Sequence, residues 1–557
     1  MPRVLIVYAN PAITATPVAP YGAERVVQAL RLAGCDARLC SPWLSHHPRR
    51  ALAAALRWKP DLVGFSVRNL DDALVVRAAT GRGDIDTTFY LPAVRRLVSD
   101  VKAAGVPVLV GGAALSSAPE GVLRHLGVRH GIVGPSDDLV WRLGRALAAG
   151  VPFPAALPQD PRVIDLDGPI PHRARGDADA WQPLPGPTPR DAAWLALARE
   201  RDGRVPVQTS AGCDRRCTFC VEASFLGWRV RTRPVAEVVR EIALLREAGV
   251  RRFWLSASEL NVPDARPAVA LLRALAEAGL EVDVLGFLQP APVGDALLDA
   301  FQGVGVDPAR LSWEFGHLDD ALLRRGAGPC NLAAIDKLVG LYARRGHSTL
   351  GGSVLLGAHP EETLAHVDRA LMEARRLDAA LPGGLGLAWA AGGRVYAAAP
   401  LGRWVEEHPA EARPHLYGRL TAGFVAPLVF CRPDSPRRLF AHVAAGLSGC
   451  RGQMGPLNAE AVSDPRALAA ERWVNLAVVR AVEDDVVGAV RAARAAIRQV
   501  PGHAEALKQL GLLLANRRGD LAGALDTFRA LAVVVRDDPA RAREIDSVVR
   551  QLEALRT

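Results

Sequence analysis

The run Ala211-Gly212-Cys213-Asp214-Arg215-Arg216-Cys217-Thr218-Phe219-Cys220 decides how this chain is interpreted. Its three cysteines have a C-x3-C-x2-C spacing and follow a short apolar strand predicted at 205–209. A compact loop of this kind directs three thiolates toward one point, which suits three irons of a [4Fe–4S] cluster and leaves the fourth iron without a cysteine. An open iron binds a further ligand. The spacing therefore predicts a reactive centre with Cys213, Cys217 and Cys220 as the metal ligands.

Two simpler interpretations fit less well. A structural zinc site needs a fourth Cys or His close by, and none follows Cys220. A disulfide framework is disfavoured because the chain has 8 cysteines in 557 residues and its start, Met1 to Val7, runs directly into a strand instead of a secretory segment. The other cysteines form no second cluster pattern and are predicted to be buried small hydrophobic residues: Cys35, Cys40, Cys330, Cys431 and Cys450.

Composition limits the classes of function. With 23% charged and 50% hydrophobic residues, 557 residues are enough for two to four globular domains. No stretch approaches the roughly 20 apolar residues that span a bilayer, so we expect no membrane association and a cytoplasmic, reducing location. The net charge of +9 comes from arginines scattered over helices. There is no basic stripe with interleaved aromatics, so nucleic-acid binding is not expected.

Residues 1–150 alternate between short apolar strands and amphipathic helices. This pattern predicts an open, doubly wound parallel sheet covered on both faces, with ligands at the carboxyl ends of the strands. The loops expected there are 10–21, 68–72, 111–117 and 134–138. Gly111 and Gly112 remove side-chain bulk where a strand ends, which either admits a large cofactor or simply makes a tight turn.

A second α/β region covers residues 201–401. Its strand-like runs are predicted at 205–209, 252–256, 282–288, 311–315, 349–356 and 385–390. Six such units indicate a partial α/β barrel whose site lies at the carboxyl ends of its strands.

The cysteine run, with an aromatic residue just before the last cysteine, resembles the radical S-adenosylmethionine (SAM) enzymes. In that family the amino and carboxylate groups of SAM chelate the open iron, and an electron from the cluster usually cleaves the sulfonium to give a 5′-deoxyadenosyl radical. The resemblance implies that Phe219 contacts the adenine of SAM.

The glycine-containing loops of the first 150 residues, placed before this module, resemble the cobalamin-binding domain of the B12-dependent branch of the family. The D-x-H-x-x-G signature that supplies a cobalt ligand is missing, and Arg68 is a candidate for the lower face of the corrin; its alternative is an ion pair with Asp71 or Asp72. A guanidinium has no lone pair with which to ligate cobalt. The resemblance implies these cofactor-binding residues: Asn10, Tyr21, Gly22, Ser66, Arg68, Asn69, Gly111, Gly112, Ala113, Ser116 and Gly134.

The resemblance also assigns residues of the barrel. Glu259 is expected to hold the SAM amino group or, alternatively, to reach the open iron itself, and Gly357 to lie near the SAM ribose and carboxylate. Glu314 and Tyr396 are the other catalytic candidates, as general base and substrate contact. His317, which follows the same strand as Glu314, is an alternative general base, although a lone His in a loop is more often a solvated residue.

The boundaries predicted from composition are a cobalamin-binding domain at 1–150, a linker at 151–200, the barrel at 201–401, an extension at 402–470 and a helical region at 471–557. The sequences Asp485-Val486-Val487-Gly488-Ala489 and Asp520-Leu521-Ala522-Gly523-Ala524 repeat at about 35 residues, close to the tetratricopeptide (TPR) period. Two such repeats are too few for an independent solenoid, so we expect the tail to pack on the catalytic body.

Together the resemblance implies a cobalamin-dependent radical SAM C-methyltransferase with a [4Fe–4S] cluster, SAM and methylcobalamin. The expected substrate is a natural-product precursor, as in antibiotic biosynthesis, with C2 of tryptophan as one option. Methyl transfer by a radical course and by a course without the deoxyadenosyl radical are both open. The alternatives are a B12-dependent enzyme that cyclises or rearranges its substrate and a TPR-like scaffold. The expected partner is a flavodoxin- or ferredoxin-type reductant, and the chain is expected to be a monomer.

Overall fold

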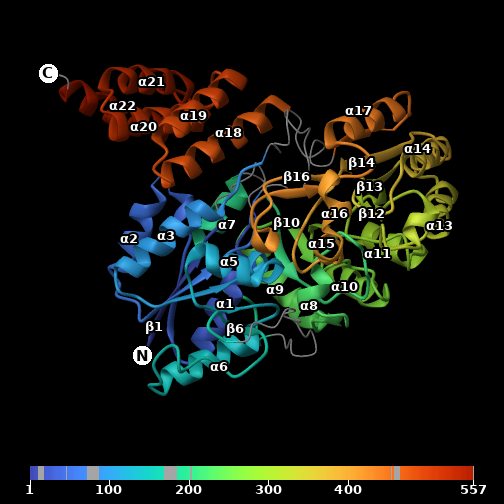
Figure 1. The fold of residues 1–557 in the computed structure, drawn as a ribbon, viewed down its shortest axis with the longest axis horizontal. Helices are drawn as coiled ribbons and strands as arrows, with labels where there is room; N and C mark the ends of the chain where they lie inside the picture. Colours follow the sequence, from blue (N-terminus) through green and yellow to red (C-terminus); the bar gives the residue numbers. More distant parts are fainter. Residues whose placement is uncertain are drawn as a thin grey trace.

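The computed structural model describes residues 1–10, 18–45, 47–71, 87–168, 184, 186–200, 203–452, 454–456 and 465–555. Figure 1 shows an N-terminal α/β domain (blue) beside a partial barrel (green to yellow), with a helical tail (red) next to the N-terminal domain. The predicted α/β class with a C-terminal helical region is confirmed. None of the helices in the described ranges is long and apolar enough to cross a membrane.

The N-terminal sheet has the strand order β2-β1-β3-β4-β5-β6. Its first five strands are parallel, and the sixth is antiparallel to β5. The strands are β1 (Arg3–Tyr8), β2 (Asp36–Cys40), β3 (Leu62–Ser66), β4 (Val108–Gly111), β5 (His130–Ile132) and β6 (Val163–Asp165). Since β6 comes from the segment predicted to be a linker, the first part of that segment belongs to this sheet.

Alternating residues of the central strand bury both faces of the sheet, as a doubly wound fold requires. Leu5 and Val7 pack in the core under α3 and α5, whereas Val4 and Ile6 pack in the core under α1 and α6. The helices of this domain are α1 (Tyr21–Leu32), α2 (Pro48–Leu56), α3 (Leu91–Ala103), α4 (Ala113–Ser117), α5 (Pro119–Leu126) and α6 (Asp137–Ala148); α7 (Ala192–Glu200) follows the domain.

The turn after β4 requires a glycine for a steric reason. Gly112 has φ +102°, and a Cβ there would lie 2.4 Å from the Val67 carbonyl oxygen. The close approach of β4 to the end of β3 therefore explains Gly112, in agreement with the tight-turn interpretation.

The barrel consists of two parallel sheets, of order β11-β10-β7 and β12-β13-β14-β18. A bridge between Leu288 and Trp313 joins them, and the Glu314 N–H donates to the Leu288 carbonyl at 2.7 Å. The strands are β7 (Val205–Gln208), β10 (Arg252–Ser256), β11 (Asp283–Leu285), β12 (Ser312–Gly316), β13 (Leu350–Leu356), β14 (Leu385–Ala391) and β18 (Met454–Pro456). The first six are the six predicted strands, and β18 is a further strand from the predicted extension.

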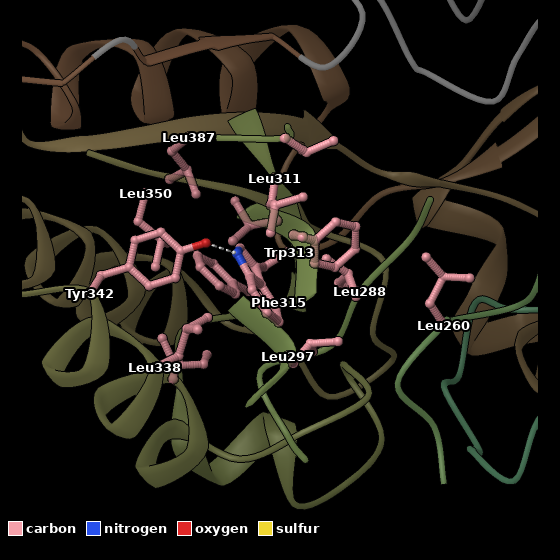
Figure 2. Packing of buried hydrophobic residues seen from close by; sticks show 14 of the residues in the cluster. Leu260, Leu288, Leu297, Leu311, Trp313, Phe315, Leu338, Tyr342, Leu350 and Leu387 are labelled. Atoms are coloured by element: carbon pink, nitrogen blue, oxygen red, sulfur yellow. Dashed lines mark hydrogen bonds between the residues drawn. The ribbon is translucent and has the colours of Figure 1, made fainter. Parts of the chain in front are cut away.

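Helices cover the outer face of the barrel sheets. They are α9 (Val235–Glu247), α10 (Arg266–Glu277), α11 (Asp295–Gly303), α13 (Leu332–Arg344) and α14 (Leu364–Ala379). Two short helices, α8 (Glu222–Leu226) after the cysteine loop and α12 (Asp320–Leu323) after β12, connect other segments. Figure 2 shows the core beneath them, where Trp313 and Phe315 of β12 are buried and the Trp313 indole N–H donates to the Tyr342 hydroxyl at 3.0 Å. Because side chains alternate along a strand, Glu314 between them faces the barrel interior.

The extension forms a small antiparallel sheet, of order β15-β17-β16, against the end of the barrel. Its elements are β15 (Gly393–Arg394), α15 (Pro400–Glu407), α16 (Pro409–Ala412), β16 (Leu416–Gly418), β17 (Leu428–Phe430) and α17 (Pro436–Gly446).

The tail contains helices α18 to α22. Asp485 and Asp520, the first residues of the repeated sequence, occupy the same structural position: each accepts the N–H of the glycine three residues on, at 2.8 and 2.9 Å, and so caps a helix. The tail packs on the N-terminal domain, where Val479 and Val482 of α18 join the core under α3. The part of the catalytic body that the described tail residues pack on is therefore the sheet domain. The helices are α18 (Pro465–Val482), α19 (Val486–Gln499), α20 (Ala504–Leu513), α21 (Leu521–Val534) and α22 (Pro539–Ala554).

Candidate active site

The three cysteines of the C-x3-C-x2-C run line one cavity, of about 80 Å³, at the carboxyl ends of the barrel strands. Phe219 lines it between the cysteines, and Glu259 and Glu314 line it from the strands opposite. Cys213 and Cys217 are 6% and 8% exposed, and Cys220 is half-buried. The structure thus brings these six predicted residues into one site.

Backbone contacts from distant segments hold the cysteine loop. The N–H of Thr218 donates to the Gly326 carbonyl at 2.8 Å, and its own carbonyl accepts the Leu401 N–H at 2.8 Å. Gly212 precedes the first cysteine at φ +98°, where a Cβ would lie 2.1 Å from the Arg229 carbonyl oxygen. Each end of the loop is therefore fixed by chain that lies outside the loop.

Buried carboxyl groups surround the cysteines. The Cys213 Sγ lies 3.8 Å from Glu259 Oε2. Burial raises the pKa of the Glu259 carboxyl to about 7, although the Gln289 amide partly offsets this. Burial likewise raises the pKa of Glu314, which accepts a hydrogen bond from the Ser353 hydroxyl, and of Glu222. Several carboxyl groups in a site that is shielded from water favour the binding of a cationic ligand.

The donor set fits an iron–sulfur cluster with one open iron. Burial raises the pKa of the Cys213 thiol to about 12 and also raises those of Cys217 and Cys220, so these thiols need a metal to become thiolates. No set of three or more His, Cys, Asp or Glu in the described part of the chain is arranged to hold a single ion. Cluster thiolates each bind a different iron and need no such convergence.

A second, larger cavity, of about 270 Å³, opens between the carboxyl ends of the N-terminal strands and the barrel. Its lining runs from a deep apolar slot between the sheet and α1 and α6 to Gln208, Ala211 and Phe225 of the barrel. Eight residues predicted to bind cobalamin line it: Tyr21, Gly22, Ser66, Gly111, Gly112, Ala113, Ser116 and Gly134. Its largely apolar lining and its position fit a cofactor with an apolar appendage.

Three other residues predicted to bind cobalamin lie near this cavity without lining it. Asn10 is buried just after β1, and Asn69 is half-buried in the loop after β3. Arg68 is exposed in the same loop. The alternative partner Asp71 pairs instead with Arg394 of β15, at 3.0 Å and with both side chains buried; Asp72 lies outside the described residues.

Tyr396 and Gly357 do not line the cysteine cavity. The Tyr396 ring lies under the Arg394 guanidinium, 5.0 Å from it, and packs against the core of the N-terminal domain. Burial raises the pKa of its hydroxyl, and Asp71 and Cys220 both lie close enough to add to this rise. Gly357 follows β13, and its carbonyl accepts the Arg432 N–H at 3.0 Å.

His317 is not the solvated loop residue that was expected. It is fully buried, accepts the Asp319 N–H at Nδ1 (2.9 Å) and meets Glu362 at Nε2 (3.2 Å). The expectation was wrong because the partner, Glu362, comes from a turn 45 residues later, and no local pattern indicates that pairing.

Sequence reasoning also missed a buried ionic network between the two main domains. Arg190 binds Glu24 of α1 at 2.8 Å and Glu241 of α9 at 3.3 Å. Arg233 binds Glu241 at 2.9 Å and donates to the Tyr21 hydroxyl at 3.2 Å. The network therefore fixes Tyr21, a lining residue of the larger cavity, to the barrel.

Residues 207–372 match the Radical SAM superfamily model. These residues form a radical SAM domain. The chain is also 33% identical over 237 residues to the ribosomal protein uS12 methylthiotransferase RimO of Kineococcus radiotolerans, covering 40% of this chain and 48% of that protein. It is 25% identical over 312 residues to the tryptophan 2-C-methyltransferase of Streptomyces laurentii, covering 45% of this chain and 49% of that protein. The chain thus spans about half the length of the curated relatives it matches.

Among solved structures, the fold is similar to that of the radical SAM methyltransferase TsrM from Kitasatospora setae, determined with cobalamin and a [4Fe-4S] cluster. The TM-score is 0.66 at 20% identity, over 89% of this chain and 100% of that one. The cobalamin-dependent SAM radical enzyme OxsB matches with a TM-score of 0.58 at 11% identity, over 100% of this chain and 84% of that one. The predicted fold, a doubly wound Rossmann-like domain followed by a partial α/β barrel, is confirmed.

Proposed function

We propose that this radical SAM chain is a cobalamin-dependent C-methyltransferase that moves a methyl group from SAM to a carbon of a small-molecule precursor. When bound, the cluster would supply electrons and an iron for SAM, and cobalamin would carry the methyl group. Cys213, Cys217 and Cys220 would hold the cluster, and the residues that line the larger cavity would hold cobalamin.

The observation that carries the proposal is the closeness of the two cavities. Ala211 lines the larger cavity, and Cys213, two residues further along the same chain segment, lines the cysteine cavity. Two residues of chain extend about 7 Å at most. Groups bound in the two cavities would therefore face each other across one short segment, as transfer from a carrier to a substrate requires.

The residues of the cysteine cavity have distinct roles in this proposal. Glu259, 3.8 Å from the Cys213 sulfur, would bind the cationic amino group of SAM, and Phe219 would contact the adenine. Glu314 faces the barrel interior and would act as the base, since burial raises the pKa of its carboxyl and so makes it a stronger proton acceptor. Gly386, Ala388 and Ala390 of β14 share the inward face of that strand, so small residues leave room for a substrate there.

Tryptophan is the first substrate to test. Both the tryptophan 2-C-methyltransferase of Streptomyces laurentii and TsrM, whose structure was determined with tryptophan bound, are similar to this chain. At 25% and 21% identity, the likeness supports a choice of assay and leaves the acceptor carbon to the experiment.

Methylthiotransferase activity is the second candidate, because RimO proteins are similar to part of this chain. In the family pattern that activity uses a second cysteine triad before the barrel. The first 200 residues contain two cysteines, Cys35 and Cys40. Cys35 is buried against α6, where its thiol donates to the Gly144 carbonyl at 3.5 Å. This arrangement favours methyl over methylthio transfer.

The test is anaerobic reconstitution with iron, sulfide and hydroxocobalamin, followed by turnover with tryptophan and SAM that carries a deuterated methyl group. We expect four irons and one corrinoid per chain, and a product that carries the label on carbon. The ratio of 5′-deoxyadenosine to S-adenosylhomocysteine then separates the radical course from the other one. Cys217→Ala should abolish turnover, while Cys450→Ala, a half-buried cysteine outside the cavity, should retain it. A labelled product from Cys217→Ala, or SAM consumption that yields only cyclised or rearranged product, would contradict the proposal.

A further inference from the structure

Two hollows adjoin where the helical tail meets the N-terminal domain (Figure 1). One, of about 310 Å³, lies between the start of α2 and the tail helices α18 and α20. The other is an open depression between α2 and the end of α3. Arg49 and Arg50 line both hollows, so the two form one continuous groove along α2, which we call the α2 groove.

The α2 groove has an excess of positive charge. Among the described residues its lining contains one carboxylate, Asp100, and these cationic side chains: Arg49, Arg50, Arg57, Lys59 and Arg517. Asp100 is already engaged, since its two oxygens each accept from Arg49 at 2.7 Å. Asp484 of the tail pairs with Arg49 at 3.4 Å and with Arg517 at 3.3 Å. These two carboxylates therefore neutralise only part of the positive charge.

The other cations of the groove are available to a partner. The side chains of Arg50, Arg57 and Lys59 are exposed and make no ion pair or hydrogen bond within the described part of the chain. Arg50, Ala53 and Arg57 follow one another at intervals of three and four residues, so they share one face of α2. Exposed arginines alone are typical of a solvated helix, but here they line a hollow, and the alanine between them leaves room for another chain to approach.

The uncharged part of the lining is mostly aliphatic and indicates the class of partner. It includes Ala53, Leu56 and Ala103 in the open part and Val478 and Leu512 beneath the tail. No aromatic residue lines the described groove, whereas proteins that bind single-stranded nucleic acid stack its bases on aromatic side chains. Acidic groups attached to aliphatic side chains fit this surface better than phosphates attached to bases.

The length of the groove favours a polypeptide segment over a small anion. Helix α2 has nine residues and is therefore about 13 Å long. An extended peptide covers this distance with about four residues. A single small anion would contact the cations at one point and leave the aliphatic part of the lining exposed.

We propose that the α2 groove binds an acidic segment of a partner polypeptide that also carries aliphatic side chains. Its carboxylates pair with Arg50, Arg57 and Lys59, and its aliphatic side chains pack on the lining between α2, α3 and the tail. Stacked helical repeats commonly present such binding surfaces. The inference goes beyond the proposed function, because it assigns a role to the tail, which the methyl-transfer chemistry does not use.

The experiment titrates the full chain with a fluorescein-labelled peptide composed of glutamate, leucine and serine, and follows the fluorescence anisotropy. No cofactor or turnover is needed. We expect saturable binding that weakens as salt is added. A second peptide, in which serine replaces every leucine, should bind more weakly, since it has no aliphatic side chain to bury.

The decisive variant is Arg50→Glu combined with Arg57→Glu. It should lower the affinity for the leucine-containing peptide about tenfold or more, because each reversal replaces an attraction with a repulsion. The matched control combines Arg240→Glu and Arg273→Glu, which reverses two exposed arginines on α9 and α10 and changes the net charge equally. The control should leave the affinity unchanged.

Four results would overturn the inference: no saturable binding, equal affinity for the two peptides, an equal loss in both double variants, or tighter binding of a single-stranded oligonucleotide that the Arg50→Glu/Arg57→Glu variant loses. The last result would assign the groove to nucleic acid. None of them affects the proposed function, because this double variant should transfer methyl groups to a free small-molecule substrate as the unmodified chain does. Conversely, normal peptide binding by a chain without methyl transfer would overturn the proposed function alone.

Discussion

Glu259 is the single residue on which the chemistry of the cysteine cavity depends most. Its Oε2 lies 3.8 Å from the Cys213 sulfur, and other buried acids lie close to it. A cationic ligand would reduce the repulsion between these acids. A carboxylate that pairs with a buried ammonium makes a charge-assisted hydrogen bond. The role of this side chain can be tested without an assay for methyl transfer.

We expect Glu259→Gln to lower the SAM affinity of the reconstituted protein by about 10- to 100-fold, because the amide keeps the shape and loses the charge. Equilibrium binding of SAM, with iron content as a check on the cluster, measures this. The matched control is Glu361→Gln, whose side chain is 55% exposed. Unchanged SAM affinity in Glu259→Gln would exclude the proposed contact.

At the scale of the element, the cysteine loop depends on backbone geometry at its first turn. Gly212→Ala would place a methyl group against the Arg229 carbonyl, in a backbone conformation that alanine rarely adopts. We expect this variant to retain clearly less iron after reconstitution, measured as iron per chain. Gly279→Ala is the control, since Gly279 also has a positive φ, +64°, with no atom within 4 Å of a Cβ. Equal iron content in both variants would show that the close contact between Gly212 and the Arg229 carbonyl does not affect iron binding by the loop.

A second element is fixed by one carboxylate. Asp378, at the end of α14, accepts the N–H groups of Leu385, Arg451 and Gly452 at 2.8, 2.7 and 2.9 Å, which joins β14 to the segment before β18. Burial alone would raise the pKa of Asp378, but these three donors outweigh it and lower the pKa.

Asp378→Ala should lower the free energy of unfolding by about 3 kcal/mol, at about 1 kcal/mol for each lost hydrogen bond. Since the folded-state pKa is lowered, the contribution of the carboxylate is complete above its ordinary pKa and is lost as the pH falls through the folded-state value. Denaturant unfolding at neutral and acidic pH measures both effects, with Asp299→Ala, an exposed aspartate, as the control. If the difference in unfolding free energy between the unmodified chain and Asp378→Ala stayed constant down to low pH, the ionised carboxylate would not be the source of the stability.

The sequence predicted those parts of the fold and site whose signal is local. The cysteine spacing, the six barrel strands and the glycine-containing loops each lie within a few residues, and the structure places them as the spacing indicates. β6 and β18 were missed because they lie in stretches of mixed, Pro-containing composition that show little periodicity. The buried ion pair of Arg25 with Asp137 and the His317–Glu362 pair could not be predicted, because the two partners of each lie far apart in the sequence.

At the scale of the whole molecule, the two domains are joined by buried charges as well as by apolar contacts. Glu24, Arg190, Arg233 and Glu241 have side chains between 0% and 4% exposed, and their formal charges cancel. Removing one partner of such a set leaves an uncompensated buried charge, which typically costs about 3–5 kcal/mol. The network therefore couples the position of the larger cavity to that of the barrel.

Glu241→Gln should destabilise the chain by a few kcal/mol, about the cost of breaking a buried pair, and should weaken corrinoid binding, because Arg233 would lose the anion that orients it toward Tyr21. Thermal unfolding and corrinoid titration measure the two effects. Glu247→Gln, an exposed glutamate on the same helix, should leave both unchanged. If Glu241→Gln lowered the unfolding temperature but left the corrinoid affinity unchanged, the network would stabilise the fold without influencing the cofactor.

The contact between Thr218 and Leu401 has a consequence for biosynthesis. The segment that would receive iron is synthesised long before the residue that holds it in place, and the strand that completes the barrel sheet, β18, is made later still. A nascent polypeptide halted before residue 401 therefore presents the three thiols on an unsupported stretch. Metal insertion should accordingly wait until residue 401 has been synthesised and has bonded to Thr218.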